Sequence, residues 1–415
     1  MSKRKMKDSG VEWLGEIPAE WDLVPARNLF SEVKDKNIAG KVTRQFSFRY
    51  GKIVDKDKSG RSDVTTDETI TAYRIVTPDT IMINGLNLNY DFISQRVAIV
   101  EERGIITSAY LALCPNKKLI EPVFAVYLFK GYDSKQVFHG HGSGIRKTLN
   151  YSDFKEIKTV CPDLSTQRKI AAYLDARCAK IDEMISDAKK TIEEYKAWKA
   201  SVIFEAVTGK MEVRRGRLRE KSELGESGVE WLGAVPEGWQ ICCLKYLCSM
   251  QAGKTLSSEE ILDEGPYPVY GGNGLRGFYS EFNTSGEYAL IGRQGALCGN
   301  VHFVDGQFWA TEHALVTTPS EKVELPYLYW LLVAMDLNRY VSQTAAQPGL
   351  AASVILNVKT VFPPLAEQRT IANFLDKKCA AIDRVISEKE SLIADLEAYK
   401  KSLIFECVTG KMEVA

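Results

Sequence analysis

One stretch that occurs twice constrains the fold of this 415-residue chain more than any other feature. Residues 162–213 and 363–414 are identical at 28 of 52 positions at a constant offset of 201, and both end with the heptapeptide VTGKMEV. Identity at this level and at a fixed offset marks an internal repeat, so the chain is expected to consist of two related halves.

Each copy of the repeat is predicted to form one long helix. Apolar residues recur at alternating steps of four and three, which is the heptad pattern of a coiled coil. Gly209 and Gly410 are expected to cap the helices in a left-handed conformation. Each helix should contain about 40 residues and span roughly 60 Å. The predicted contact positions are Leu174, Cys178, Ile181, Ile185, Ile192, Leu375, Cys379, Ile382, Ile386, Ile393 and Leu396.

A polar residue occupies the same heptad position in both copies, Lys199 in the first and Lys400 in the second. A matched polar residue in the seam can fix the register of a coiled coil. Alternatively, each lysine extends its ammonium group to solvent at a frayed helix end. Two matched helices in one chain are expected to pair with each other, and the short linker Arg214–Glu226 predicts an antiparallel pair.

A second repeat precedes each globular part. Residues 9–21 and 227–239 are identical at nine of 13 positions, and their tryptophans beside Pro18 and Pro236 are expected to clamp each lead-in onto a helix base. The predicted segments are a lead-in at 1–21, a globular domain at 22–161, a helix at 162–213, a linker with the second lead-in at 214–239, a second globular domain at 240–362 and a second helix at 363–415.

The two globular segments differ at most positions yet share a frame. Five residues between 107 and 122 recur 204 positions later, and an apolar helix follows in both segments. Short alternating runs such as 81–83 and 301–304 predict strands. The predicted fold class is α+β: two similar mixed α/β domains separated by two long antiparallel coiled-coil helices, with a pseudo-two-fold repeat. Such a chain is suited to hold two related readers of two different half-sites.

Composition gives weaker indications. The formal net charge is zero, so no overall basic field points to nonspecific binding of nucleic acid. Nine cysteines without a CxxC pair are typical of reduced thiols in the cytosol. A basic N-terminus without an apolar stretch behind it, and the lack of any run of 18 apolar residues, predict a soluble cytoplasmic protein without a membrane partner.

If the two half-sites lie in DNA, the candidates for contacts are polar loops that carry Arg, Lys, Asn, Gln and His beside glycines. The richest are HGHGSGIRK at 139–147 and YGGNGLR at 270–276. For each residue alone, turn formation or a solvated surface is the simpler explanation. The candidates in the first domain are Asn84, Asn87, Asn89, His139, His141, Arg146 and Lys147, and those in the second are Tyr270, Asn273, Arg276, Arg293, Gln294, Asn300, Gln343 and Gln347.

The two domains also differ in charge. Residues 22–161 hold 21 Lys and Arg against 16 Asp and Glu, whereas residues 240–362 hold seven against 11. The second domain is therefore not expected to bind phosphates strongly on its own.

Motifs for catalysis are missing from the sequence. It contains no Asn/Asp-Pro-Pro-Tyr tetrapeptide for a flipped base and no phosphate loop, and Thr208-Gly209-Lys210 ends a helix instead of starting one. His139 and His141 have no further Cys or His at ligand spacing, so no metal site is predicted.

Taken together, the ordered motifs resemble the specificity subunits of type I restriction–modification systems, the HsdS family. The resemblance covers nearly the whole chain and rests on the GVEWLG lead-ins at 10–21 and 228–239, the Gln-Arg pairs at 167–168 and 368–369, and the closing FE…VTGK segments at 204–210 and 405–411.

This resemblance implies that 22–161 and 240–362 are target recognition domains, each reading half of an asymmetric, interrupted site in double-stranded DNA. The paired helices would set the gap and dock two methyltransferase subunits. The chain itself would not be an enzyme and would bind no cofactor: S-adenosylmethionine, ATP and magnesium are expected on partner subunits, which would include a restriction subunit in up to two copies.

Two other functions are compatible with parts of the sequence. One is a stand-alone methyltransferase or nuclease, against which the missing motifs argue. The other is a non-catalytic coiled-coil adaptor that holds two protein-binding domains.

Overall fold

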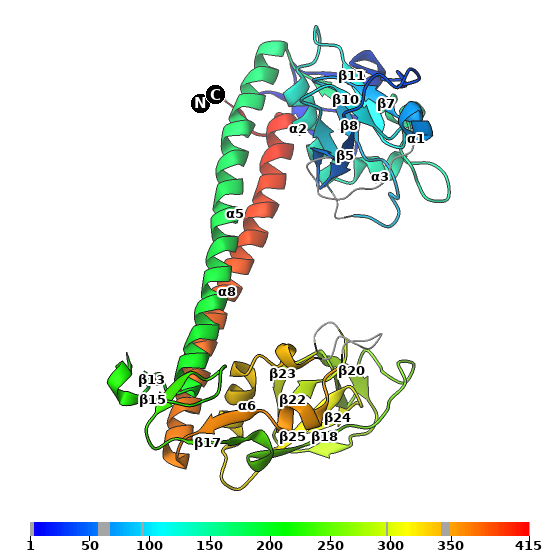
Figure 1. Ribbon diagram of the computed structural model, residues 1–415. Helices are drawn as coiled ribbons and strands as arrows, with labels where there is room; N and C mark the ends of the chain where they lie inside the picture. Colours follow the sequence, from blue (N-terminus) through cyan, green and yellow to red (C-terminus); the bar gives the residue numbers. More distant parts are fainter. Residues whose placement is uncertain (1–3, 57–66, 93–94, 296–297, 342–348, 415) are drawn as a thin grey trace. The chain divides into compact units, whose positions relative to one another are not determined.

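The computed structural model describes residues 4–56, 67–92, 95–295, 298–341 and 349–414 (Figure 1). It divides into two compact units. Unit 1 comprises Met1–Lys189 and Glu390–Ala415, and unit 2 comprises Lys190–Lys389. The division falls inside both long helices, so each unit contains one globular domain and one segment of each helix.

Both copies of the repeat are single long helices, as predicted. Helix α5 spans Leu164–Val207 and helix α8 spans Leu365–Val408, with 44 residues each. Both are followed by a glycine in the left-handed region, Gly209 with φ 76° and Gly410 with φ 72°. Residues with a Cβ avoid this conformation, so these glycines end the helices as the sequence indicated.

Within each unit the helix segments pack through their apolar seam. In unit 1 the first part of α5 contacts the last part of α8, where Lys400 binds Asp182. In unit 2 the last part of α5 contacts the first part of α8, where Lys199 binds Asp383. The segments therefore run antiparallel within each unit. Leu174, Cys178, Ile181, Ile185, Ile192, Leu375, Cys379, Ile382 and Ile386 are buried, whereas Ile393 and Leu396 are half-buried.

A four-stranded antiparallel sheet forms the frame of each globular domain, and the strand order is the same in both. It is β4-β11-β8-β9 in unit 1 and β18-β25-β22-β23 in unit 2. An apolar helix with Pro in its first turn follows the second strand of each order. The elements are β4 Phe30–Glu32, β8 Ile81–Ile83, β9 Val97–Ile99, β11 Leu111–Pro115, α2 Pro122–Ser134, β18 Cys248–Ala252, β22 Tyr288–Gly292, β23 Val301–Val304, β25 Ala314–Pro319 and α6 Leu325–Ala334.

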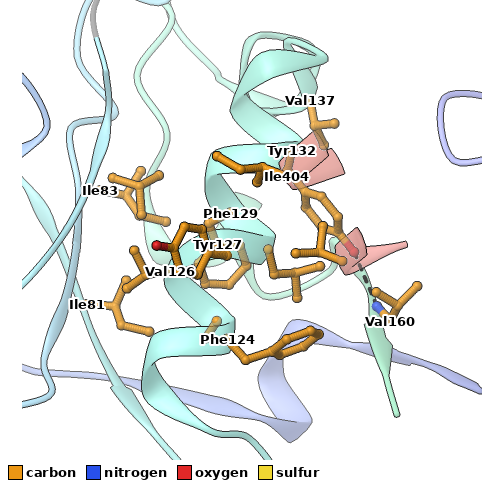
Figure 2. Packing of buried hydrophobic residues seen from close by; sticks show 14 of the residues in the cluster. Ile81, Ile83, Phe124, Val126, Tyr127, Phe129, Tyr132, Val137, Val160 and Ile404 are labelled. Carbon is orange, nitrogen blue, oxygen red and sulfur yellow. Dashed lines mark hydrogen bonds between the residues drawn. The ribbon is translucent and has the colours of Figure 1, made fainter. Parts of the chain in front are cut away.

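The main core of unit 1 joins this sheet to α2 and to the long helices (Figure 2). Ile83 of β8, Phe129 and Tyr132 of α2, and Ile404 of α8 belong to one buried cluster. The Tyr132 hydroxyl accepts a hydrogen bond of 3.2 Å from the Val160 amide, so the only polar atom of this side chain has a partner inside the core. The domain is thereby fixed to the helix segments of its own unit.

A hairpin lies beside each frame sheet. In unit 1 it is formed by β5, Phe46–Arg49, and β6, Lys52–Asp55; in unit 2 by β19, Tyr267–Gly271, and β20, Gly274–Tyr279. Each hairpin also pairs in parallel with the strand that precedes β11 or β25 in the chain. In unit 1 Gln45, just before β5, pairs with Ile105, and in unit 2 Val269 of β19 pairs with Trp309. The strands around them are β7 Arg74–Val76, β10 Gly104–Ile106, β21 Thr284–Ser285 and β24 Gln307–Ala310.

Each lead-in is packed on the end of a long helix in its own unit. A Cβ on Gly410 would lie 2.4 Å from Pro18 Cγ, and one on Gly209 would lie 2.5 Å from Pro236 Cγ. The predicted clamp therefore exists, and it requires glycine at both helix ends. The lead-in strands are β1 Met6–Asp8, β2 Glu16–Pro18, β15 Leu224–Glu226 and β16 Ala234–Pro236. The strand pairs that follow are β3 Asp22–Pro25 with β12 Lys158–Cys161, and β17 Gln240–Cys243 with β26 Lys359–Phe362.

Two elements differ from what the sequence predicted. His139 and His141 lie in helix α3, Val137–His141, and not in a glycine-rich loop, because Val137 and Phe138 anchor that turn in the core. Likewise, residues 270–276 form the strands and turn of the β19–β20 hairpin instead of a loop. The other elements are α1 Asp67–Ala72, α4 Tyr151–Phe154, α7 Ala352–Leu356, β13 Met211–Glu212, β14 Arg217–Leu218, and the 3₁₀ turns Ala26–Asn28, Lys221–Glu223, Leu244–Tyr246 and Leu337–Tyr340.

None of the helices in the described part of the chain carries an apolar stretch long enough to cross a lipid bilayer.

Candidate nucleic-acid interface

Two candidate clusters of unit 1 meet at one edge of the domain. The first follows β8 at residues 84–91, and the second lies between α3 and α4 at residues 142–149. Their backbones are joined by hydrogen bonds from Leu149 N to Gly85 O, 2.9 Å, and from Leu88 N to Lys147 O, 3.0 Å. The two segments therefore present their polar side chains as one surface, which we call the unit 1 edge.

The three candidate asparagines have different surroundings in this edge. Asn84 Oδ1 accepts from the Leu86 amide at 3.2 Å, and Asn89 Nδ2 donates to the Ile145 carbonyl at 3.2 Å. These two side chains shape the loops. Asn87 has φ 53° and is exposed, so its amide is available to a ligand.

The candidate cations and histidines of this edge are mostly accessible. His141, Arg146 and Lys147 are exposed. His139 is half-buried: its Nε2 lies 3.1 Å from the Asp91 carbonyl oxygen, and its ring stacks on Phe92 at 5.0 Å between centroids. His139 therefore supports the loop, while the other three can contact phosphates or bases.

Arg96 organises the unit 1 edge, although the sequence analysis did not select it. Its side chain is 1% exposed. The guanidinium donates to the carbonyl oxygens of Asn84 and Leu86, both at 2.9 Å, and also to that of Asp91. Three carbonyls of one loop are thus held by one buried cation. A single arginine in the sequence gives no signal of this kind.

Asp133 of α2 lies next to this arginine. Its Oδ2 accepts from the Arg96 amide at 3.3 Å. Burial raises the pKa of the Asp133 carboxyl to about 6, although the hydrogen bond and the charge of Arg96 lower it in part.

The candidate residues of unit 2 also lie together, at a glycine crossing where the backbones of Gly272 and Gly292 come into close contact. A Cβ on Gly272 would lie 2.7 Å from the Gln294 carbonyl oxygen, and one on Gly292 would lie 1.9 Å from the Gly272 carbonyl oxygen. Only glycine allows the hairpin turn and the segment after β22 to approach this closely. This brings residues 270–276 together with residues 293–295 and 298–300 in what we call the unit 2 edge.

Within the unit 2 edge, exposure again distinguishes the residues that could contact a ligand from those that support the fold. Asn273 in the turn and Arg276 on β20 are exposed. Tyr270 is half-buried and packs edge-on against Phe308 at 5.6 Å between centroids. Arg293, Gln294 and Asn300 are half-buried.

The backbone after β22 is tied to the segment before α7. Leu350 N donates to Arg293 O at 2.8 Å, and Gln294 pairs with Gly349. Gln343 and Gln347 lie outside the described residues. Gly349 and Leu350, which follow them and are described, contact the unit 2 edge. The corresponding contact in unit 1 is the hydrogen bond from Leu149 to Gly85.

Several buried polar atoms near the glycine crossing have no hydrogen-bond partner among the described residues. They are His302 Nε2, Thr311 Oγ1, Glu312 Oε2 and His313 Nδ1. Burial lowers the pKa of His302, which favours the neutral imidazole. Within the described ranges, His, Cys, Asp and Glu do not form a group of three or more that could hold a metal ion.

The long helices carry matched ion pairs. Lys199 Nζ lies 2.7 Å from both carboxylate oxygens of Asp383, and Lys400 Nζ lies 2.6 Å from both of Asp182. Each residue of one pair is 201 positions from its counterpart in the other. The lysines thus bind a carboxylate of the opposite helix, which supports the register-fixing interpretation over fraying.

Comparisons with known proteins agree with this architecture. Residues 236–392 match the family model described as the type I restriction modification DNA specificity domain. The type I restriction enzyme EcoprrI specificity subunit of Escherichia coli is 43% identical over 138 residues, which is 32% of this chain and 34% of that protein. The MjaVIII specificity subunit of Methanocaldococcus jannaschii is 22% identical over 426 aligned residues, covering 96% of this chain and 94% of that protein.

Solved structures share the fold over nearly the whole chain. One comes from a study of complex assembly and conformational transition of the type I R-M system; its TM-score is 0.70 at 15% identity, covering 95% of this chain and 99% of that chain. The HsdS subunit from Thermoanaerobacter tengcongensis has a TM-score of 0.51 at 15% identity, covering 98% and 100%. The relatives are named specificity subunits. The chain is therefore similar to the specificity subunits of type I restriction–modification systems, and its residues 236–392 match the model of their DNA specificity domain.

Proposed function

We propose that this chain is the DNA-recognition subunit of a type I restriction–modification complex, and that each globular domain reads one half of an asymmetric, bipartite site. Residues 22–161 and 240–362 would be the two target recognition domains. The paired helices would set the gap between half-sites and dock two methyltransferase subunits.

One observation carries this proposal. In both domains the two segments at corresponding places of the common frame are joined by a hydrogen bond, yet the sequences of these segments differ between the domains. In unit 1 the segment after β8 is tied to the segment before α4 through Leu149 and Gly85. In unit 2 the segment after β22 is tied to the segment before α7 through Leu350 and Arg293. A constant frame with variable polar edges is what two readers of different base sequences require.

The helices support a docking role through accessible aromatic side chains at repeat-related positions. Trp198 is exposed beside Lys378, whose Nζ lies 4.5 Å from the ring centroid, and Tyr399 is exposed 201 positions after Trp198. Aromatic residues are enriched at protein interfaces. Two equivalent surfaces fit two copies of one partner, which we take to be the methyltransferase subunit.

The proposed division of labour assigns all chemistry to partners. S-adenosylmethionine, ATP and magnesium would bind to methyltransferase and restriction subunits in the cytoplasm. The excess of acidic residues in 240–362 leaves much of the attraction to phosphates in the second half-site to those partners.

The proposal predicts separable effects of one exposed arginine in each edge. After mapping methylated adenines in the host, the complex would be assayed on duplexes of the mapped site. Arg146→Ala should relax base preference in one half, and Arg276→Ala in the other, each by about 1–3 kcal/mol if a base contact is lost.

The matched controls are Lys118→Ala and Lys322→Ala, which remove exposed cations 204 positions apart and outside both edges. They should leave base preference unchanged. A host methylome that does not change when the gene is deleted would contradict the proposal, and an adaptor of two protein-binding domains would then be the better account.

A further inference from the structure

The β5–β6 hairpin occupies the same place in unit 1 as β19–β20 does in unit 2. Both hairpins are paired in parallel with the strand before β11 or β25. Both have two residues in the turn, because Arg49 pairs with Lys52 and Gly271 with Gly274. The turn Tyr50-Gly51 is therefore the counterpart of Gly272-Asn273, which the sequence singled out in the second domain only.

The tip of this hairpin adjoins the unit 1 edge. A Cβ on Gly51 would lie 2.7 Å from Gln95 Oε1 and 2.8 Å from Gln95 Cβ, so the turn rests directly on that side chain. The next residue is Arg96, whose guanidinium holds the carbonyls of the 84–91 segment. The unit 2 turn also contacts its own edge, but through backbone, since a Cβ on Gly272 would lie 2.7 Å from the Gln294 carbonyl oxygen. The tip thus extends the candidate interface.

Tyr50 at the tip has an unusual conformation and exposure. Its side chain is 90% exposed, and its φ is 49°. Two-residue hairpin turns favour Asn or Gly at this position, and a bulky residue with positive φ is rare. Burial does not account for an aromatic ring in such a place, and strained residues of this kind concentrate at functional sites.

We propose that the Tyr50-Gly51 tip is a further DNA-contacting element, with the Tyr50 ring against base edges of the half-site read by unit 1. The flanking residues favour DNA over an apolar partner, because Arg49 and Lys52 are cations that flank the turn and pair with each other across the hairpin. Lys52 is exposed and suits a phosphate. This inference rests on the proposed function and adds a specificity-determining residue to it.

The test uses Tyr50→Asn in the full chain assembled with its methyltransferase subunits. Asn suits a left-handed turn position, so the hairpin should persist while the ring is lost. The probes are a duplex of the mapped site, duplexes with single base changes in each half, and a duplex without the site. Binding of the mapped duplex should weaken at least about fivefold, the smaller end of the loss of one base contact, with discrimination lost in one half only.

Two further variants separate the parts of the inference. Lys52→Gln should weaken binding to the mapped and unrelated duplexes by the same factor and lower the salt slope by about one. Tyr246→Asn removes an exposed tyrosine of unit 2 outside both edges and should change nothing.

Unchanged affinity and discrimination in Tyr50→Asn, with Arg146→Ala still altering one half-site, would overturn this inference and leave the proposed function intact. Failure of the unaltered complex to distinguish the mapped duplex from an unrelated one would instead refute the proposed function itself.

Discussion

The matched ion pairs between the long helices allow a quantitative test of how the helices choose their register. We consider Asp383→Lys, which places a second ammonium group beside Lys199, and the exchanged double variant Lys199→Asp with Asp383→Lys. If the pair fixes register, the single change should destabilise unit 2, and the exchange should restore most of the loss.

The size of the effect follows from exposure. The side chains of Lys199 and Asp383 are 27% and 55% exposed, so water screens the pair and its contribution is up to about 1 kcal/mol. Asp383→Lys removes this attraction and adds a repulsion of similar size, which together cost about 1–2 kcal/mol. For a domain of this size the Tm should fall by about 2–8 °C.

Thermal unfolding of Asp383→Lys, Lys199→Asp and the double variant, at about 0.05 M and about 0.5 M salt, gives the coupling energy and its screening. The coupling should shrink at the higher salt. The exposed pair Glu193–Lys196 within α5 is the matched control and should show a coupling near zero. Equal Tm values for Asp383→Lys and the exchanged variant would refute the argument, since the apolar seam alone would then set the register.

Three other predictions address the helix ends, the core and the spacing. Gly410→Ala puts a methyl group 2.4 Å from a proline ring carbon at φ 72° and should cost about 2–5 kcal/mol, whereas Gly40→Ala, at φ 62° in open space, should cost about 1 kcal/mol by thermal unfolding. Burial makes folded Asp133 bind its proton more tightly than the unfolded chain does, so the protonated carboxyl contributes its full stability below pH about 4, and this contribution is lost as the pH rises through about 6. Above that range the free energy of unfolding of Asp133→Asn should therefore exceed that of the unaltered chain by up to about 3 kcal/mol. An equal difference at all pH values would refute this. Deleting one heptad from both helices, 185–191 with 386–392, removes about 10 Å of helix and should shorten the mapped gap by up to about three base pairs, while an unchanged gap would assign the spacing to docked partners.

The sequence predicted the features that depend on local periodicity or on direct repetition. The heptad seam from Leu174 onward, the caps at Gly209 and Gly410, and the strand at 81–83 follow from patterns within a few neighbouring residues. The common frame could also be predicted, because its spaced residues recur at a constant offset.

Features that depend on contacts between distant residues could not be predicted. The sequence marked residues 84–89 and 139–147 separately, but their union depends on hydrogen bonds across some sixty positions, such as Leu149 to Gly85. Arg96 could not be singled out from the sequence, because its three carbonyl partners are set by the folded loop. The β5–β6 tip was missed because only the sheet order identifies its counterpart in unit 2.

The most direct test of the central claim exchanges one reader. Residues 240–362 would be replaced by the corresponding domain of another specificity subunit, and methylated adenines would be mapped across the host genome. If each domain reads one half-site, the bases of one half change while the other half and the gap stay as they were. A change in both halves, or in neither, would contradict the account.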